Sequence, residues 1–177
     1  IWCIADLLML GILGMIMRPN LEDAKAPTES WLTIRWAFLS LFHRLALPSL
    51  KWMVPSFVGT IYYRMMGCKI GKGAQLNSPH INACFMVEIG ERTEIGGDAA
   101  INGHLFEKDG IHLAKIRIGA KAVVGAGAQI NPGCVIGDRA VVASKAVLPK
   151  FTEVPAGEVW GGIPAKCIRR ADGSKPE

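Results

Sequence analysis

Residues 118–159 read IGAKAV-VGAGAQ-INPGCV-IGDRAV-VASKAV-LPKFTE-VPAGEV, which are seven consecutive units of six residues. Every unit begins with Ile, Leu or Val, and the fifth residue of the first five units is small. A six-residue period fits neither the 3.6-residue helix nor the two-residue alternation of a simple strand. It indicates a short strand followed by a corner, with the first residue of each unit pointing into a narrow interior. Three units would close one triangular coil, and stacked coils would form a solenoid.

The same pattern occurs earlier in the chain, in units that begin at Ile70, Ile89, Ile95 and Ile101. Gly, Asn or Asp fills the second or third position of many units, and we expect these residues to supply the unusual backbone angles of the corners. The regular repeat breaks at residues 107–117, which we interpret as a loop inserted on the surface of the solenoid.

These repeats resemble the hexapeptide-repeat superfamily over roughly residues 66–170. The resemblance implies an all-β fold, a left-handed parallel β-helix, here preceded by one or two hydrophobic membrane-associated α-helices. Most members of that superfamily are acyltransferases, whose donor is coenzyme A or a carrier-protein phosphopantetheine thioester. The resemblance therefore implies transfer of an acyl group to an amine or hydroxyl acceptor, with no metal expected. Members assemble as trimers with active sites between neighbouring prisms, so we expect a homotrimer or pseudo-trimer of β-helices.

The first part of the chain is hydrophobic. Residues 1–17 carry Asp6 as their only charge, and we expect a transmembrane helix there, with a buried helix of a soluble domain as the alternative. Because the chain opens with Ile rather than Met, we expect a fragment whose first helix is truncated.

A polar loop at 18–30 precedes a second hydrophobic or interfacial helix at 31–50. The basic residues that follow place the β-helix on the cytoplasmic side of a membrane by the positive-inside rule. The remaining segments are a connector at 51–69, the β-helix at 70–170 and a flexible tail at 171–177.

His104 is the candidate general base. It stands at the fourth position of its unit, which we expect to face outward near a corner, just before the inserted loop. An imidazole titrates near neutral pH and takes a proton from an attacking amine or hydroxyl. We expect Asn102 or backbone N–H groups to stabilise the oxyanion, and Glu107 or Asp109 to hold the imidazole tautomer. The alternative is a solvated corner histidine without a catalytic role.

Residues 159–169, VWGGIPAKCIR, are similar to the closing segment of the superfamily. In relatives the backbone and a lysine near this turn lie along the pantetheine or nucleotide of the donor. The resemblance therefore implies donor-binding roles for Gly162, Pro164, Ala165 and Lys166. The alternative is that this segment only covers the open end of the last coil.

The stretch GHLFEKDG at residues 103–110 is similar to a narrower group. These are the C-terminal β-helix domains of nonribosomal peptide synthetases of the ε-polylysine synthetase type, which lie next to membrane helices. This resemblance implies an aminoacyl thioester donor, an amine acceptor and a place as the terminal domain of a membrane-bound amino-acid polymer synthetase. A non-catalytic β-helix that scaffolds or oligomerises a larger synthetase is the alternative.

Other function classes fit the sequence less well. Gamma carbonic anhydrases, a second alternative, need three histidines, two of them in an H-x4-H arrangement. The histidines here are His43, His80, His104 and His112, none of them five residues apart. The five cysteines form no CxxC pair, which argues against a disulfide framework and a zinc site. The net charge of +5 is spread along the chain without an aromatic-rich basic stripe, so we expect no nucleic-acid binding.

Overall fold

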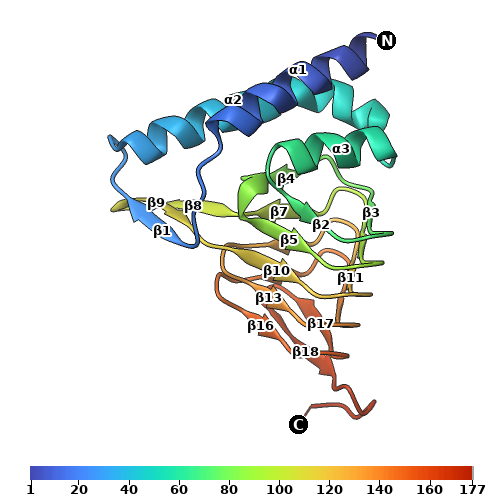
Figure 1. Cartoon of the computed structure of the whole chain (residues 1–177). Coiled ribbons are helices and arrows are strands. Elements are labelled where there is room, and N and C mark those ends of the chain that lie inside the picture. The colour runs from blue at the N-terminus through green and yellow to red at the C-terminus, as the bar shows by residue number, and fades with distance from the viewer. Residues whose placement is uncertain (177) are drawn as a thin grey trace.

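The computed structural model describes residues 1–176 (Figure 1). Its three helices are α1 (Trp2–Met17), α2 (Trp31–Met53) and α3 (Phe57–Met65). They lie together at one end of the molecule, and the strands extend from them toward the C-terminus (Figure 1). Buried side chains of the helices and of the strands form one continuous hydrophobic core, so the helices close the first end of the strand region.

Three parallel sheets form the sides of a prism. The first sheet contains β2 (Lys69–Ile70), β5 (Val87–Ile89), β10 (Ile116–Ile118), β13 (Val135–Ile136) and β16 (Glu153–Val154). The second contains β3 (Gln75–Leu76), β6 (Glu94–Ile95), β11 (Val123–Val124), β14 (Val141–Val142), β17 (Val159–Gly162) and the antiparallel β18 (Ala165–Arg169). The third contains β4 (Ile81–Asn82), β7 (Ala100–Asn102), β12 (Gln129–Ile130) and β15 (Val147–Leu148). A short 3-10 helix, η1 (Cys84–Met86), lies between β4 and β5.

The strand register follows the repeat. Ile118 pairs with Ile89 on one side and with Ile136, three units further along the chain, on the other. Residues at the same position of the repeat therefore stack on one another from coil to coil. The predicted three-sided parallel β-helix is confirmed.

The interior is filled as the repeat predicts. The first-position residues are at most 3% exposed: Ile118, Val124, Ile130, Ile136, Val142, Leu148 and Val154. The small fifth-position residues are at most 1% exposed: Ala122, Ala128, Cys134, Ala140 and Ala146. Because every coil buries its apolar residues against the next coil, the stack has one continuous core.

The corners differ from the prediction in which residue takes the unusual backbone conformation. Positive φ angles occur at the fourth position of the units, for example 56° at Lys121 and 58° at Arg139. The second-position glycines serve a different purpose, because neighbouring coils approach closely there. A Cβ atom on Gly137 would lie 2.5 Å from the backbone nitrogen of Ala156 in the next coil.

Replacing Gly137 with alanine should therefore destabilise the β-helix by about 1–3 kcal/mol, since the crowded atom belongs to the backbone. Gly97→Ala is the matched control, because a Cβ atom on Gly97 would come no closer than 3.9 Å to its nearest neighbour, Asn77 O. Urea unfolding followed by circular dichroism measures both variants. Equal losses of stability in the two variants would contradict the role assigned to Gly137.

A small antiparallel sheet projects from one corner of the prism. Residues 107–117, predicted as a surface loop, belong largely to a hairpin of β8 (His104–Glu107) and β9 (Gly110–Leu113). Residues 18–30, predicted as a polar loop, contain β1 (Ala24–Ala26), which pairs with β9. Both predictions missed strands because a strand of three or four residues forms only where a partner supplies its hydrogen bonds.

The connector predicted at 51–69 contains the helix α3, and the second predicted helix, 31–50, extends to Met53. The Ser30 side chain accepts a hydrogen bond from the Thr33 N–H at the start of α2, and Ser56 caps α3 in the same way. The predicted start of the second helix agrees with the start of α2 at Trp31. The capped helix α3 was not predicted.

The prediction of a transmembrane helix at residues 1–17 is not supported. A helix forms there, but α1 has 16 residues, whereas a bilayer core requires about 20. Within residues 1–176, no helix combines the length and the apolar character that a membrane crossing needs. Asp6, the one charge in α1, accepts a hydrogen bond from the Ser49 hydroxyl of α2 at 2.6 Å, so it is used in packing between the helices.

Candidate active site

A cavity of about 210 Å³ lies between α2 and the first coils of the β-helix. It is lined by residues from both layers and none of its lining residues is acidic. The polar and aromatic residues that matter for its chemistry are Trp36, His43 and Arg44 from α2, Asn82 from β4, Asn102 from β7 and His104 from β8.

The path of the backbone places His104 in this cavity. The preceding Gly103 passes close to η1, since a Cβ atom there would lie 2.7 Å from the Met86 Cβ atom. His104 then begins β8, which leaves the prism and pairs with β9. Because β9 also pairs with β1, and β1 leads directly into α2, the start of α2 is held over β8.

Trp36 of α2 covers His104. The two ring centroids are 4.6 Å apart, and the Trp36 ring also contacts Phe106 edge to face at 5.0 Å. His104 is therefore partly buried under a helix, which differs from the predicted outward and solvated position.

The surroundings of His104 keep its imidazole neutral. Burial, together with the charge of Arg44, lowers the pKa of His104 from 6.5 to about 4. The buried Nδ1 atom has no hydrogen-bond partner. A neutral imidazole that faces a cavity is able to accept a proton from a bound nucleophile, which is the property required of a general base.

Asn102 lines the same cavity, and its Oδ1 atom accepts a hydrogen bond from the Asn82 side-chain amide at 2.8 Å. The bond ties β7 to β4 and fixes the Asn102 side chain. The structure therefore brings together His104 and Asn102, two of the four predicted catalytic residues.

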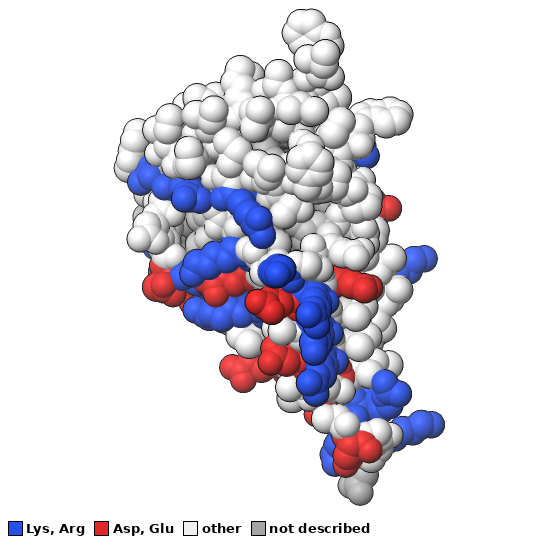
Figure 2. All heavy atoms as spheres, turned by 45° about the vertical axis from the view of Figure 1, so that its right-hand side comes forward, with Lys and Arg blue, Asp and Glu red and all other residues white. Residues whose placement is uncertain are grey.

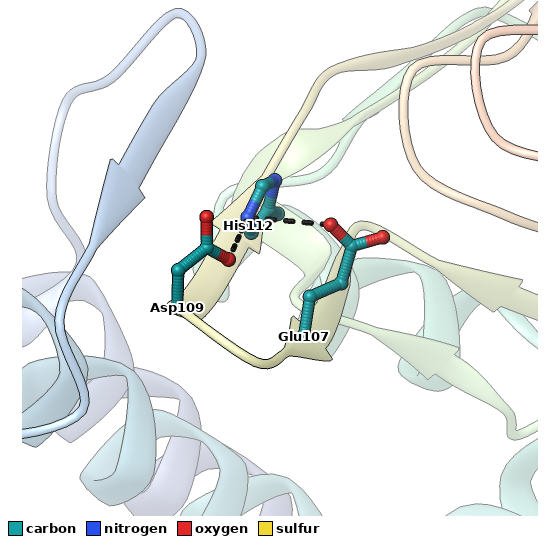
Figure 3. Close-up of side chains that lie close together, drawn as sticks. All are labelled: Glu107, Asp109 and His112. Carbon is teal, nitrogen blue, oxygen red and sulfur yellow. Dashed lines mark hydrogen bonds and ion pairs between the residues drawn. The ribbon is translucent and has the colours of Figure 1, made fainter.

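Glu107 and Asp109 lie elsewhere, at the tip of the β8–β9 hairpin (Figure 3). His112 Nε2 is 3.1 Å from Asp109 Oδ1 and 3.5 Å from Glu107 Oε2. The expected role of Glu107 and Asp109 in orienting His104 is therefore not met. The hairpin register directs both carboxylates to His112.

Each of these carboxylates also pairs with a lysine. Lys150 contacts Glu107, and Lys25 contacts Asp109. The hydrogen bond from Lys25, followed by that from His112, lowers the pKa of Asp109 to about 2, and the Lys150 hydrogen bond lowers the pKa of Glu107. Both carboxylates are ionised and already neutralised at neutral pH.

In the part of the chain that the structure describes, Glu107, Asp109 and His112 form the one group of three side chains with metal-ligating atoms close together. The group contains a single histidine and is exposed, and its carboxylates are paired with lysines. Within residues 1–176 the histidines form no three-histidine cluster of the gamma carbonic anhydrase type.

The four predicted donor-binding residues lie together at the turn between β17 and β18. Gly162 has a φ of 98° and pairs with Ala165, while Lys166 and Pro164 are exposed. This turn lies at the opposite end of the prism from the helices that cover the cavity (Figure 1). β18 folds back on β17 and ends the second sheet, so the segment covers the last coil. The donor-binding roles implied for these four residues stay a prediction.

The contribution of α2 to the site was not predicted from the sequence. Trp36, Ser40, His43 and Arg44 follow one another at helical spacing and line the cavity together. That spacing could have revealed a polar stripe on an otherwise apolar helix. Asn82 gave no comparable signal, because it belongs to a coil in which the repeat is irregular.

Part of the chain matches a described family of repeats. Residues 115–150 match the family described as bacterial transferase hexapeptide (six repeats). Delta-poly-L-ornithine synthetase of Acinetobacter baumannii is 24% identical over 162 residues, which cover 89% of this chain. The matched part is 12% of the length of that synthetase.

Solved structures share the fold at low sequence identity. A hexapeptide-repeat-containing acetyltransferase of Vibrio cholerae O1 biovar eltor, complexed with acetyl coenzyme A, has a TM-score of 0.57 and 18% identity over 93% of this chain and 98% of its own. A galactoside acetyltransferase in complex with coenzyme A has a TM-score of 0.53 and 19% identity over 73% and 80%. A maltose O-acetyltransferase of Clostridium difficile 630 has a TM-score of 0.51 and 19% identity over 85% and 91%. The chain thus carries the bacterial transferase hexapeptide repeat and has the left-handed β-helix fold of the hexapeptide-repeat acetyltransferases.

Proposed function

We propose that this chain transfers an acyl or aminoacyl group from a thioester donor to an amine or hydroxyl acceptor in the cavity beneath α2. One observation carries the proposal. The cavity holds a neutral, partly buried His104 beside Asn102, and it lies on a β-helix whose fold is that of acetyltransferases.

The reaction requires one group that accepts and returns a proton and one group that stabilises the oxyanion. His104 takes a proton from the acceptor N–H or O–H as that nitrogen or oxygen attacks the thioester carbonyl carbon. Asn102 or a backbone N–H stabilises the negative charge on the carbonyl oxygen. The carbon–sulfur bond then breaks, and the departing thiolate receives the proton from the His104 imidazolium. The products are an amide or ester and a free thiol, and His104 returns to its neutral form.

We propose further that the domain acts at the end of an amino-acid polymer synthetase, with an aminoacyl thioester on a carrier protein as donor. The match to 12% of delta-poly-L-ornithine synthetase supports this assignment. Coenzyme A is the competing donor, and the acetyltransferases with the same fold support it.

Parallel assays separate these donors. The chain is incubated with an amine acceptor and either acetyl coenzyme A or an aminoacyl-phosphopantetheine thioester, and mass spectrometry identifies the product. We expect product with the aminoacyl thioester and none above background with acetyl coenzyme A. The opposite preference would reassign the donor to coenzyme A. Absence of product with either donor would contradict acyl transfer and favour the scaffold alternative.

We propose that the helical end of the molecule lies on a membrane surface, with the β-helix on the cytoplasmic side. Large apolar side chains are exposed on its outer face, and in Figure 2 this end is white over most of its surface, with blue side chains where it meets the β-helix. The exposed side chains include Trp2, Leu8, Met9, Ile12 and Ile16 of α1 and Trp31, Phe38, Leu41 and Leu45 of α2. An apolar face next to basic residues fits the interface of an anionic membrane.

Flotation with phosphatidylglycerol-containing vesicles tests this location. We expect the chain to float with the vesicles, and Leu8→Glu together with Leu41→Glu to leave it in the dense fraction. A native chain that stays in the dense fraction would contradict the proposal. The homotrimer implied by the superfamily is also proposed, and sedimentation equilibrium would give three times the chain mass of 19.1 kDa.

A further inference from the structure

The first 65 residues of the chain contain four arginines, and three of them have a structural partner. Arg18, Arg35 and Arg64 each donate hydrogen bonds to backbone carbonyl oxygens at least six residues away. The fourth, Arg44, makes no hydrogen bond or ion pair with any other group in residues 1–176. Its guanidinium is therefore free to bind a group that this part of the chain does not supply.

Arg44 lines the cavity beneath α2, together with His104 and Asn102. It is exposed, so a molecule that enters the cavity can reach its side chain. Arg44 follows Trp36, which covers His104, by eight residues, or about 12 Å along the helix axis. Side chains of a helix lean toward its N-terminus, so the Arg44 side chain leans toward Trp36 and His104. In agreement with this direction, the charge of Arg44 is, after burial, the second cause of the lowered pKa of His104.

The charges around the cavity favour an anionic ligand. None of the lining residues is acidic. The two histidines that line it, His43 and His104, are neutral at neutral pH because burial lowers the pKa of each to about 4. Arg44 is therefore the one charged residue among those that line the cavity in the described part of the chain. A simple ammonium ion is repelled at this position, whereas an anionic group is attracted.

The place of Arg44 beside the base indicates which substrate carries the anionic group. Both thioester donors carry their phosphate at the far end of the pantetheine arm, well away from the carbonyl carbon that is attacked. An anionic group that meets Arg44 in the same cavity as His104 therefore belongs to the acceptor. In an amino acid, a carboxylate lies a few bonds from the nucleophilic nitrogen. The paired N–H groups of a guanidinium match the two oxygens of such a carboxylate.

We propose that Arg44 binds the carboxylate of the acyl acceptor, so that the acceptor is a molecule with both a nucleophile and a carboxylate, as in an amino acid, rather than a simple amine or alcohol. This role rests on the proposed acyl-transfer function. The helix α2 then holds one end of the acceptor while His104 takes the proton from its nucleophile. Arg44 contacts no reacting atom, so it contributes to acceptor binding and specificity.

Steady-state kinetics with the preferred thioester donor and two matched acceptors tests the proposal. L-Ornithine carries a carboxylate where L-ornithinamide carries a neutral carboxamide of similar size. We expect the native chain to favour L-ornithine by about 10- to 100-fold in kcat/KM, as for hydrogen bonds to a charged group. Arg44→Gln should lower kcat/KM for L-ornithine by about the same factor and leave that for L-ornithinamide within about threefold of the native value. The loss should fall mainly on the acceptor KM, because the carboxylate is bound equally in the ground state and the transition state.

Two further variants separate the guanidinium from charge in general. Arg44→Lys keeps the positive charge but loses the paired N–H groups, so it should retain only part of the preference for L-ornithine. Lys51→Gln is the matched control, because it removes one positive charge from an exposed position of the same helix outside the cavity. The acceptor preference of Lys51→Gln should equal that of the native chain.

Equal kcat/KM values for the two acceptors in the native chain, or a preference that survives Arg44→Gln, would overturn the proposal and leave acyl transfer standing. Loss of flotation with phosphatidylglycerol vesicles in Arg44→Gln, with the acceptor preference unchanged, would show that Arg44 binds lipid phosphate instead. If the native chain turns over neither acceptor with either donor, the acyl-transfer function fails, and the role of Arg44 fails with it.

A second measurement does not depend on turnover. An NMR titration of the histidine-labelled chain gives the pKa of His104 in the native protein and in Arg44→Gln. Removing the neighbouring positive charge should raise this pKa above its native value of about 4, while burial, the larger cause, keeps it below 6.5. An unchanged pKa of His104 would show that the guanidinium does not lie beside the base and would refute the proposed role.

Discussion

Replacing His104 with alanine should lower kcat/KM for thioester transfer by about 10²- to 10⁴-fold, because the acceptor then attacks without a base to take its proton. Release of the free thiol, followed with a chromogenic disulfide reagent, measures the rate. The fold should survive this change, since His104 is only partly buried and makes no hydrogen bond through its Nδ1 atom.

The pH dependence of kcat/KM distinguishes a base with the lowered pKa of His104 from a base with an ordinary pKa. With its pKa lowered from 6.5 to about 4, His104 is unprotonated over the whole range from pH 8 to about pH 5. With a hydroxyl acceptor, which does not titrate in this range, the native kcat/KM should stay nearly flat, whereas a base with an ordinary pKa of 6.5 would lose most of its activity by pH 5. His112→Gln should leave both the rate and the profile unchanged, because His112 lies with Glu107 and Asp109 at the hairpin tip. A histidine-like decline with a midpoint near pH 6.5 would show that the base is not the buried His104.

Protonation of His43 alone should lower the free energy of unfolding by about 3 kcal/mol as the pH falls from 6.5 to 4. The folded state keeps His43 neutral down to a pKa of about 4, while in the unfolded chain the imidazole binds a proton below about 6.5. Stability is therefore complete above the unfolded pKa and is lost as the pH falls toward the folded pKa. The pKa of His104 is shifted in the same direction, so it adds to the loss.

Urea denaturation at pH 7, 6, 5 and 4.5 measures this dependence. His43→Gln removes one of the two titrating histidines and should reduce the decline by about half. The carboxylates Glu22, Glu107, Asp109 and Asp172 have lowered pKa values in the folded chain, so they add to the loss only near pH 4, where the unfolded carboxylates begin to bind protons, and His43→Gln leaves that part unchanged. If the native chain and His43→Gln show the same decline between pH 6.5 and 4.5, the buried neutral state of His43 is wrong.

The candidate site was only partly predictable from the sequence. His104 and Asn102 were identifiable because they stand next to the break in the repeat, where a solenoid carries its insertions. The contacts of Glu107 and Asp109 were not identifiable, since they depend on a hairpin register that pairs Glu107 with Gly110 and turns both carboxylates toward His112. The donor-binding assignment at the β17–β18 turn came from a resemblance, and it remains separate from the cavity (Figure 1).

The sequence by itself determined the β-helix. A residue of one coil packs on the residues three units before and after it in the sequence. A pattern repeated every six residues therefore predicts both which residues are buried and which residues they contact. Even there, the need for glycine at the second position came from the backbone of the next coil, which the pattern does not reveal.

Only the tertiary structure decided what covers His104. Trp36 lies 68 positions before His104 in the chain, and it reaches the imidazole because β1 pairs with β9 and anchors α2 over the hairpin. The same packing buries His43 against Tyr62, whose hydroxyl lies 3.3 Å from His43 Nδ1. Such contacts join segments with no shared periodicity. These contacts are stabilised by burial and hydrogen bonding in the assembled fold, so a local pattern of residues does not predict them.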